Sequence, residues 1–470
     1  MSLPLSRWAR ALPERYGRTT LLILVLILLV GLGLRAYRVV EPLATPGDDA
    51  HAYYALSKAL YEEGSYGGPE FDDPSDWSPG APLLYAASFY ATGGAREGVA
   101  RIVEALLGAA AIIVVFLLAT RIACRPAGLI AAFGVAVYPP FIHSTGALMS
   151  EPPAIFTLPA AVLAFLWASD RAGERLGGLS WEFLVPGFLF GLTALIRPEY
   201  LLVGAAFAVL AAIRAARTAE WRFGLAAASL LVAALLVPIV PWMVRNAIVL
   251  DRVVPISTGD GKALYVGTFL PADGEYQRVK AMLVRRYRHR DLAPNSEALD
   301  RVDPTPLFNR VAERYPDLPR DKALGKIGKQ NFSHFFGEDP AGYLAMTARK
   351  VGRMWSSGIG EAMSSTAGRA IQLLIVALGL AGLAVLAMRR RWWELLALAT
   401  PIVLVTLVGA ASLAAPRRNE VLMTLVFPLA AAALTRAGGH LSSRSQKSAA
   451  QSGSRAHGPA RDGEATSTSP

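Results

Sequence analysis

The stretch TTLLILVLILLVGLGLRAYRVVEPLATPGDDAHAYY, residues 19–54, decides the kind of fold that this chain adopts. Its first part, 19–40, is apolar over about the 20 residues that a helix needs to cross the hydrocarbon core of a membrane. A loop with two adjacent carboxylates, Asp48 and Asp49, follows the apolar run. The stretch therefore predicts a membrane-spanning helix that leads directly into an acidic extramembrane loop.

The apolar run is expected to remain in the protein as an uncleaved signal anchor. A basic N-terminus precedes it, as in a signal peptide, but no small-residue cleavage site follows. Arg35, Tyr37 and Arg38 close the run instead, and we expect them to lie at the membrane interface.

The composition extends this interpretation to the whole chain. Of its 470 residues, 53% are hydrophobic and 18% are charged, against about a quarter charged in soluble proteins. The mean hydropathy is +0.37. The net charge of +11 does not indicate nucleic-acid binding, because most basic residues flank apolar runs, where membrane topology accounts for them. The single cysteine, Cys124, excludes an intramolecular disulfide and a cysteine-rich metal site.

Apolar runs recur along the chain and predict about ten transmembrane helices. Two of them, 183–196 and 199–214, are short and are separated only by Arg197, Pro198 and Glu199. The ten predicted spans are 19–40, 99–120, 127–142, 151–169, 183–196, 199–214, 223–246, 368–388, 393–414 and 420–437.

The distribution of basic residues predicts the orientation of these spans. Short cytoplasmic loops carry an excess of Lys and Arg, and alternate connections in this chain do so. They include Arg7, Arg10, Arg15, Arg18, Arg121, Arg125, Arg171, Arg175, Arg214, Arg217, Arg222, Arg389, Arg390 and Arg391. The first connection on the other side, 41–98, is acidic instead. We therefore expect a multi-pass protein of a bacterial inner (plasma) membrane with a cytoplasmic N-terminus.

The predicted organisation places two long segments outside, where we expect a long first loop and a small α or mixed domain that lies partly on the membrane face. The expected parts are a cytoplasmic N-terminus, 1–18; an N-terminal transmembrane module, 19–249, with the first outer loop, 41–98; an outer domain, 250–367; C-terminal transmembrane helices, 368–437; and a disordered cytoplasmic tail, 438–470, rich in Ser, Gly, Ala and Arg.

Polar residues near the ends of the spans converge on the outer side. They are Asp48, Asp49, His143, Glu151, Arg197, Glu199, Arg245, Asn246, Arg417, Arg418 and Glu420. Ionisable residues at membrane depth are costly and usually mark a functional path. The alternative is that each tunes the end of its helix at the interface. Pro152 and Pro198 favour a cavity, because proline frees backbone groups that must then face protein or water.

The acidic pair suits a general base that deprotonates an acceptor hydroxyl or amine. Adjacent residues point in different directions, so we expect only one of Asp48 and Asp49 to react, while the other caps the helix that follows. Arg197, Arg245 or Arg417 is suited to binding a lipid phosphate, since guanidinium matches phosphate oxygens bidentately. The six histidines show no metal-ligand spacing. No cofactor is required, although a divalent cation beside the carboxylates is compatible with the sequence.

Several motifs resemble those of the GT-C glycosyltransferases, in particular the protein O-mannosyltransferases and the bacterial aminoarabinose transferase of lipid A. Their order along the chain follows that family over roughly residues 20 to 435. The motifs are Gly47-Asp48-Asp49-Ala50-His51-Ala52-Tyr53-Tyr54, Ser78-Pro79-Gly80-Ala81-Pro82-Leu83, Leu148-Met149-Ser150-Glu151-Pro152, Leu195-Ile196-Arg197-Pro198-Glu199, Pro241-Trp242-Met243-Val244-Arg245-Asn246 and Ser257-Thr258-Gly259-Asp260-Gly261-Lys262-Ala263-Leu264-Tyr265-Val266-Gly267.

The resemblance implies a GT-C fold and an inverting transfer of a sugar, a mannose-like hexose or a pentose, from a polyprenyl-phosphate carrier. It also implies that an outer-loop Asp is the base. Asp49 has the family's spacing to a tyrosine, at Tyr53, whereas Asp48 has the family's acidic neighbour, so the choice between them stays open. Glu151 and Glu199 are expected to shape the acceptor site or to hold the arginines.

The resemblance is incomplete near the C-terminus. Pro416-Arg417-Arg418-Asn419 departs from the family's Arg-Tyr-Arg, which leaves a phosphate role for Arg417 open. No C-terminal soluble domain is expected, so a lipid or glycan acceptor is favoured over a protein. The alternatives are a transporter or flippase of lipid-linked saccharides, which would also place charged residues in an amphipathic cavity, and a scaffold in which the acidic pair is dispensable.

Overall fold

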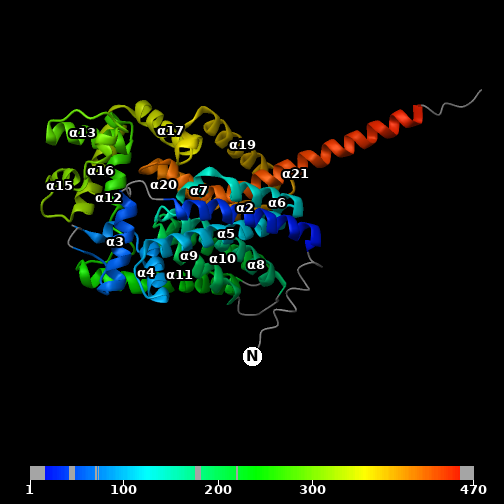
Figure 1. Cartoon of the computed structure of the whole chain (residues 1–470), viewed down its shortest axis with the longest axis horizontal. Helices are drawn as coiled ribbons and strands as arrows, with labels where there is room; N and C mark the ends of the chain where they lie inside the picture. Colours follow the sequence, from blue (N-terminus) through cyan, green and yellow to red (C-terminus); the bar gives the residue numbers. More distant parts are fainter. Residues whose placement is uncertain are drawn as a thin grey trace, which may run out of the picture.

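The protein is described here by a computed structural model. It describes residues 16–41, 48–68, 71, 73–174, 181–218 and 221–455, and for Asp48, 172–174, 218 and 439–455 it describes the backbone alone. The described part forms helices and contains no strand. The longer helices run side by side as a bundle, and a group of shorter helices, α12 to α16, covers one end of it (Figure 1).

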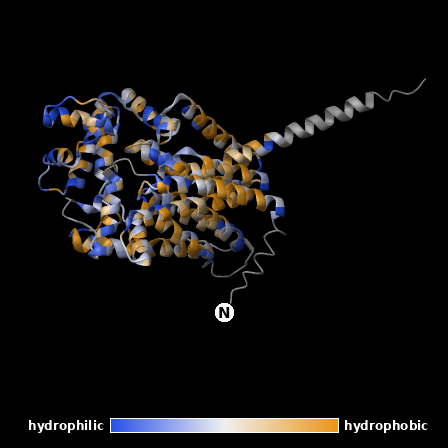
Figure 2. Cartoon of the chain, in the orientation of Figure 1, coloured by the Kyte–Doolittle hydropathy of each residue, from blue (hydrophilic) through white to orange (hydrophobic). Residues whose placement is uncertain are grey.

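Eight helices are long and apolar enough to cross a membrane. They are α2 (Arg18–Val40), α5 (Glu97–Ile122), α8 (Glu151–Glu174), α10 (Tyr200–Thr218), α11 (Trp221–Val249), α19 (Thr366–Met388), α20 (Trp392–Ala411) and α21 (Pro416–Arg455). The remaining two predicted spans, 127–142 and 183–196, coincide with shorter apolar helices, α6 (Arg125–Val137) and α9 (Leu184–Ile196). The apolar colour of the bundle in Figure 2 agrees with a helical polytopic membrane fold.

Proline decides where both of these helices end: it makes α6 shorter than the predicted span 127–142, whereas α9 ends at Ile196 as predicted. Helix α6 ends at Val137, and the prolines at 139 and 140 open a separate short helix, α7 (Pro139–Ser144). A 3-10 turn, η2 (Trp181–Phe183), leads into α9, which stops one residue before Arg197-Pro198. The residue before proline is disfavoured in the helical region, so the helix ends there.

Small residues let the apolar helices approach closely. A Cβ atom added at Gly187 or Gly191 of α9 would lie 2.3 Å from a carbonyl oxygen of α11, and one added at Gly382 of α19 would lie 2.1 Å from a carbonyl oxygen of α21. Helices in a membrane associate through such packing because lipid supplies little hydrophobic drive between them. These contacts hold the ends of α9 and α21 close to the rest of the bundle.

Arg35 corrects one expectation. It was predicted to lie at the membrane interface, but it is fully buried. Its guanidinium donates hydrogen bonds to the carbonyls of Val135 (3.1 Å) and Ala136 (3.2 Å). Those carbonyls lack helical partners because α6 ends at Val137, so Arg35 satisfies a prematurely terminated helix inside the bundle. Tyr37, by contrast, is 68% exposed, which fits an interfacial position.

The first long loop is largely helical. It contains α3 (Asp48–Glu62), the 3-10 turn η1 (Pro74–Asp76) and α4 (Gly80–Thr92). Helix α4 packs against the end of α9: a Cβ atom added at Gly80 would lie 2.6 Å from the backbone nitrogen of Ile196. This contact ties the loop that carries the acidic pair to the turn that carries Arg197.

The second long segment forms a small helical domain with its own apolar core, which includes Val266, Leu283, Phe308 and Leu324. A mixed composition was allowed by the sequence, but the described residues of this domain are helical and irregular only. Its elements are α12 (Asp260–Gly267), η3 (Leu270–Ala272), α13 (Tyr276–Arg288), α14 (Glu297–Asp300), α15 (Thr305–Ala312), α16 (Arg320–Glu338), α17 (Pro340–Ser356) and α18 (Glu361–Ser364).

A buried lysine joins this domain to the bundle. The ammonium group of Lys350, on α17, donates to the carbonyls of Gly267 (2.6 Å), Ala410 (3.0 Å) and Ser412 (2.9 Å). These carbonyls belong to the ends of α12 and α20, where helix C-termini attract a cation. Burial lowers the pKa of Lys350 to about 8. These hydrogen bonds attach the domain to the turn between α20 and α21.

The C-terminal tail differs from its prediction. It was expected to be disordered from 438, but α21 continues as a helix to Arg455 and projects from the bundle (Figure 1). Residues 456–470 lie outside the described part.

Candidate functional site

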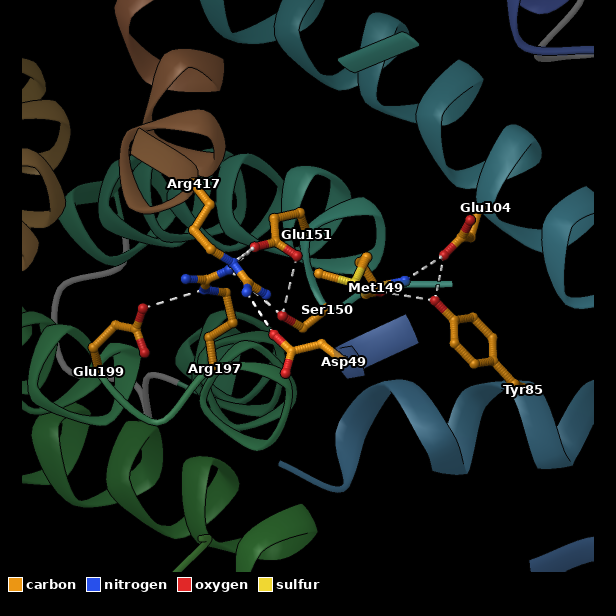
Figure 3. Close-up of polar contacts among 9 residues, drawn as sticks. All are labelled: Asp49, Tyr85, Glu104, Met149, Ser150, Glu151, Arg197, Glu199 and Arg417. Atoms are coloured by element: carbon orange, nitrogen blue, oxygen red, sulfur yellow. Dashed lines mark hydrogen bonds and ion pairs between the residues drawn. The ribbon is translucent and has the colours of Figure 1, made fainter. Parts of the chain in front are cut away.

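Four segments that are far apart in the sequence bring charged side chains together at the end of the bundle that carries α3 and α12. They are the start of α3, the start of α8, the turn between α9 and α10, and the start of α21. Five side chains meet there in one connected set of ion pairs, which we call the ion-pair network: Asp49, Glu151, Arg197, Glu199 and Arg417 (Figure 3).

Glu151 lies at the centre of the ion-pair network. Its Oε1 accepts hydrogen bonds from Nη1 of Arg197 and from Nε of Arg417, both at 2.7 Å, and its side chain is only 2% exposed. The residue opens α8, and two prolines follow it. Prolines suit the first turn of a helix, where N–H groups have no helical acceptor. The helix start therefore places Glu151 inside the protein, where two guanidinium groups balance its charge.

Arg197 connects Glu151 to Glu199. Its Nε donates to Oε1 of Glu199 at 3.1 Å, and its own side chain is 9% exposed. Arg197 has an extended backbone after the last turn of α9, because Pro198 prevents the helix from continuing. Burial raises the pKa of Glu199, but the charges of Arg197 and Arg418 and the hydrogen bonds to the carboxylate together outweigh burial and hold that pKa below its usual value. Both groups are therefore ionised at neutral pH.

Asp49 and Arg417 form the more open end of the ion-pair network. Nη1 of Arg417 donates to Oδ2 of Asp49 at 2.6 Å, and the two side chains are 41% and 34% exposed. Burial raises the pKa of Asp49, but the charge and hydrogen bond of Arg417, with a smaller contribution from Lys262, lower it below its usual value. Asp49 is therefore in its basic form at neutral pH, and its carboxylate is accessible from outside the bundle.

A second layer of contacts fixes the turn that precedes Glu151. The buried carboxylate of Glu104, on α5, accepts hydrogen bonds from the backbone N–H groups of Gly146 (2.7 Å), Leu148 (3.3 Å) and Met149 (3.2 Å). The hydroxyl of Tyr85, on α4, lies within hydrogen-bonding distance of the same carboxylate and of the Met149 carbonyl. Leu148 has a left-handed backbone with φ of 54°, which side chains other than glycine rarely adopt. Glu104 thus stabilises a strained turn.

Sequence analysis missed the role of Glu104 and Tyr85. A signal was present, since Glu104 is an acidic residue within a predicted transmembrane span, and such residues are usually functional or paired. Nothing in the sequence indicated that Glu104 binds the 146–149 turn, because only the tertiary packing of the helices brings these two segments together.

The structure separates the remaining predicted site residues. Tyr53 lies one turn after Asp49 and is buried at 6% exposure. Asp48 is the first residue of α3, and its side chain lies outside the described part. Arg245 forms no ion pair or hydrogen bond with the network. Its guanidinium donates to the Tyr66 carbonyl at 2.8 Å and to Oγ of Ser75 at 3.2 Å, so it fixes the first loop.

Arg418 adds a cation beside the ion-pair network. Its Nη1 is buried and has no hydrogen-bond partner in the described part of the chain. Its charge acts on Glu199 and on Asp260 of α12. The next residue, Asn419, donates to the carbonyls of Met354 and Ser357, which anchors this turn to α17. Arg418 is therefore a guanidinium at the site with unused donor capacity.

Among the described residues, no group of three or more His, Cys, Asp or Glu side chains is placed to hold a metal ion.

Comparison with known proteins identifies the fold. Residues 74–242, about a third of the chain, match the family model described as dolichyl-phosphate-mannose-protein mannosyltransferase. This match includes Glu151 and Arg197 and begins after the acidic pair. A search of curated proteins finds no significant match.

One solved structure shows a similar arrangement of helices, and a second superposes less closely. The archaeal oligosaccharyltransferase AglB from Archaeoglobus fulgidus, in complex with an inhibitory peptide and a dolichol-phosphate, superposes with a TM-score of 0.54 at 16% identity. The alignment covers 93% of this chain and 52% of that one, so this chain spans about half its length. ArnT from Cupriavidus metallidurans, bound to undecaprenyl phosphate, gives a TM-score of 0.38 at 12% identity, over 88% of this chain and 76% of that one. The family-model match supports the predicted resemblance over residues 74–242, and the superposition on AglB confirms the predicted helical membrane fold.

Proposed function

We propose that this chain, a protein of the GT-C superfamily of polyprenyl-phosphate-dependent glycosyltransferases, is a membrane enzyme that transfers a sugar from a polyprenyl-phosphate carrier to an acceptor hydroxyl or amine. The sugar is a hexose or a pentose, and the acceptor is a lipid or glycan. The site faces the outer side of a bacterial inner membrane, in agreement with the distribution of basic residues.

One observation carries this proposal. A partly exposed carboxylate, Asp49, lies at the open end of a buried set of ion pairs, and Arg418, whose Nη1 has no hydrogen-bond partner in the described part, adds a cation beside Glu199 at the same end of the bundle. A transfer from a lipid phosphate needs a base for the acceptor and a cation for the leaving phosphate. The described site offers both groups at one level of the membrane.

The chemical step follows from these groups. The carboxylate of Asp49, or that of Asp48, accepts the proton of the acceptor hydroxyl. The acceptor oxygen then bonds to the anomeric carbon on the face opposite the phosphate, and the bond from that carbon to the phosphate oxygen breaks. The electron pair leaves with the polyprenyl phosphate, so the configuration at the anomeric carbon inverts.

The leaving phosphate carries the charge that the protein must stabilise. Arg197 already binds the carboxylates of Glu151 and Glu199, and Arg417 binds those of Glu151 and Asp49. Arg418 has a free Nη1, which makes it the best placed phosphate ligand. Arg197 and Arg417 then act by holding Glu151 and Asp49 in position.

The bundle also offers a place for the lipid part of the carrier. An apolar groove of about 370 Å³ lies between α19, α20 and α21, below Trp355 of α17. Val426 and Leu429 line it, roughly 12 to 16 Å along α21 from Arg418. A polyprenyl chain in this groove would extend toward the arginine, so we propose that the groove binds the carrier tail.

The proposal is tested by donor turnover. Purified protein in native membrane lipid is incubated with a panel of radiolabelled polyprenyl-phosphate sugars, and release of polyprenyl phosphate is measured for wild type, Asp48→Asn and Asp49→Asn. Loss of a general base lowers the rate by about 10² to 10⁴, so one variant should lose turnover by that factor. Glu62→Gln is the matched control, since Glu62 lies on the same helix with its side chain 48% exposed.

Full turnover in both Asp variants would contradict the proposed chemistry. Binding of labelled carrier without any turnover would favour a lipid-linked saccharide transporter, which flipping assays in vesicles would then test.

A further inference from the structure

We propose that the cleft between residues 253–264 and α16 binds the anionic part of the acceptor, a glycan or lipid headgroup that carries phosphate or carboxylate groups close to the reacting hydroxyl. The proposal rests on the proposed function and adds the chemical class of the acceptor. It concerns a part of the molecule that the ion-pair network does not use.

The cleft is a half-open cavity of about 380 Å³ in the extramembrane domain. Its floor forms where α12 and α16 approach closely: a Cβ atom added at Gly261 would lie 1.9 Å from the Asp321 carbonyl oxygen, and one added at Gly325 would lie 3.6 Å from the Gly261 Cα. Small-ligand sites commonly have volumes of about 300 to 1,000 Å³. The cavity is therefore large enough for one or two sugar residues.

One wall of the cleft carries a row of cations. Lys322, Lys326 and Lys329 all line it from α16, and all three are exposed. Their spacing of four and then three residues places them on one face of the helix over about 10 Å. In the described part of the chain none of them forms an ion pair, although Lys326 lies 4.0 Å from the ring centre of Tyr315.

The carboxylates near the lysines do not neutralise them. Asp321 is bound bidentately by Arg252, with contacts of 3.0 and 2.7 Å. Asp260 is the remaining carboxylate of the lining. Burial, followed by the charge of Glu199, raises the pKa of Asp260. The lining thus carries three lysines against two carboxylates, one of which Arg252 already pairs, so the cleft has an excess of positive charge; the hydroxyl of Ser257 also lines it.

The cleft adjoins the site of the proposed reaction. The charges of Glu199 and Arg418 both act on the pKa of Asp260. Thr258 is attached to the first loop, since its N–H donates to the Ser75 carbonyl (2.8 Å) and its hydroxyl donates to Asp76 (2.9 Å). An acceptor held by the lysines is thus bound to a segment that is hydrogen-bonded to the first loop, which also carries Asp49.

The first experiment measures protection of lysines from acetylation by mass spectrometry, using the full chain in phosphatidylcholine nanodiscs. The probes are a tetrasaccharide with uronic acid residues and a neutral tetrasaccharide; in a separate arm, phosphatidylglycerol replaces phosphatidylcholine. We expect the anionic glycan or the anionic lipid to reduce labelling of Lys322, Lys326 and Lys329 by about tenfold at low salt. This protection should weaken at high salt, and labelling of Lys58, on α3, should not change.

A matched pair of variants tests whether the charge acts locally. Binding of the protective probe is measured by calorimetry for Lys322→Gln/Lys326→Gln/Lys329→Gln and for Arg285→Gln/Arg288→Gln/Arg290→Gln. The second variant removes the same charge from exposed residues in and just after α13, none of which lines the cleft. We expect the lysine variant to weaken binding by about tenfold or more and the arginine variant to leave it within twofold.

Equal protection by the neutral tetrasaccharide, absence of protection by any probe, or equal losses in the two variants would overturn the proposal. Protection by the glycan alone identifies a glycan acceptor, and protection by phosphatidylglycerol alone identifies a lipid headgroup; either supports the cleft. The labelling needs no donor turnover, so its failure does not bear on the proposed glycosyl transfer. A failure of turnover would leave protection by an anionic probe unchanged, but it would overturn the assignment of that ligand as the acceptor.

Discussion

Replacement of Glu104 by Gln tests whether the turn before Glu151 positions the site. In the structure Oε2 of Glu104 accepts the N–H groups of Gly146 and Leu148, and Oε1 accepts that of Met149. A glutamine amide has one acceptor oxygen, so either orientation leaves at least one buried N–H without an acceptor. Each such group costs about 1–3 kcal/mol. We therefore expect the free energy of unfolding of Glu104→Gln to fall by about that amount or more.

The Glu104→Gln substitution should also lower the rate of donor turnover. The turn has a left-handed residue, Leu148, and relaxation of that strain would shift Ser150 and Glu151 relative to the arginines. A displacement of about 1 Å can cost roughly 10²-fold in rate. We expect donor turnover to fall by about that factor, with the affinity for the carrier changed much less.

The assay combines thermal unfolding in detergent with the radiolabelled donor assay. Glu97→Gln is the control, because Glu97 lies on the same helix, is 41% exposed and only approaches Arg101 at 3.8 Å. Loss of such a surface pair costs under about 1 kcal/mol. If Glu104→Gln unfolds at the same temperature as the control and turns over donor within twofold of wild type, the assigned role of the turn is refuted.

Three further predictions concern two sets of ion pairs and the need for a metal ion. Arg417→Lys keeps the charge but cannot contact Asp49 and Glu151 with two nitrogens at once, so donor turnover should fall by at least about tenfold; activity equal to wild type would contradict the positioning role. Burial raises the pKa of Asp273, but hydrogen bonds from Arg349 and Arg353 to its carboxylate lower it below its unfolded value. Asp273→Asn should therefore cost about 1 kcal/mol at pH 7, and this difference, measured by denaturant unfolding, should begin to shrink as the pH falls through about 4 and should be lost only below the lowered pKa of the folded state. Treatment with EDTA should leave turnover within twofold; a larger loss that Mg²⁺ or Mn²⁺ restores would show that a metal is required.

The sequence by itself determined the membrane class and the order of the helices. Apolar length is a local property, because a span must satisfy its backbone within its own helix in the absence of water. For that reason the ranges around α2, α11 and α19 were predictable within a few residues. The convergence of Asp49, Glu151, Arg197, Glu199 and Arg417 was also anticipated, as residues at one level of one face.

Tertiary structure decided which of these residues pair and which do not. Arg245 was predicted to lie at the same membrane depth as these residues, but it binds the first loop instead. Sequence spacing predicts the depth of a residue along its helix, but it does not predict which side of the bundle that helix occupies. Arg35 was predicted to lie at the interface because its own helix ends nearby. Its guanidinium is buried instead, because the early end of α6 leaves two carbonyls inside the bundle that accept its hydrogen bonds. The lysines of α16 were not singled out from the sequence, because only the packing of α12 against α16 makes their helical face the wall of a cleft.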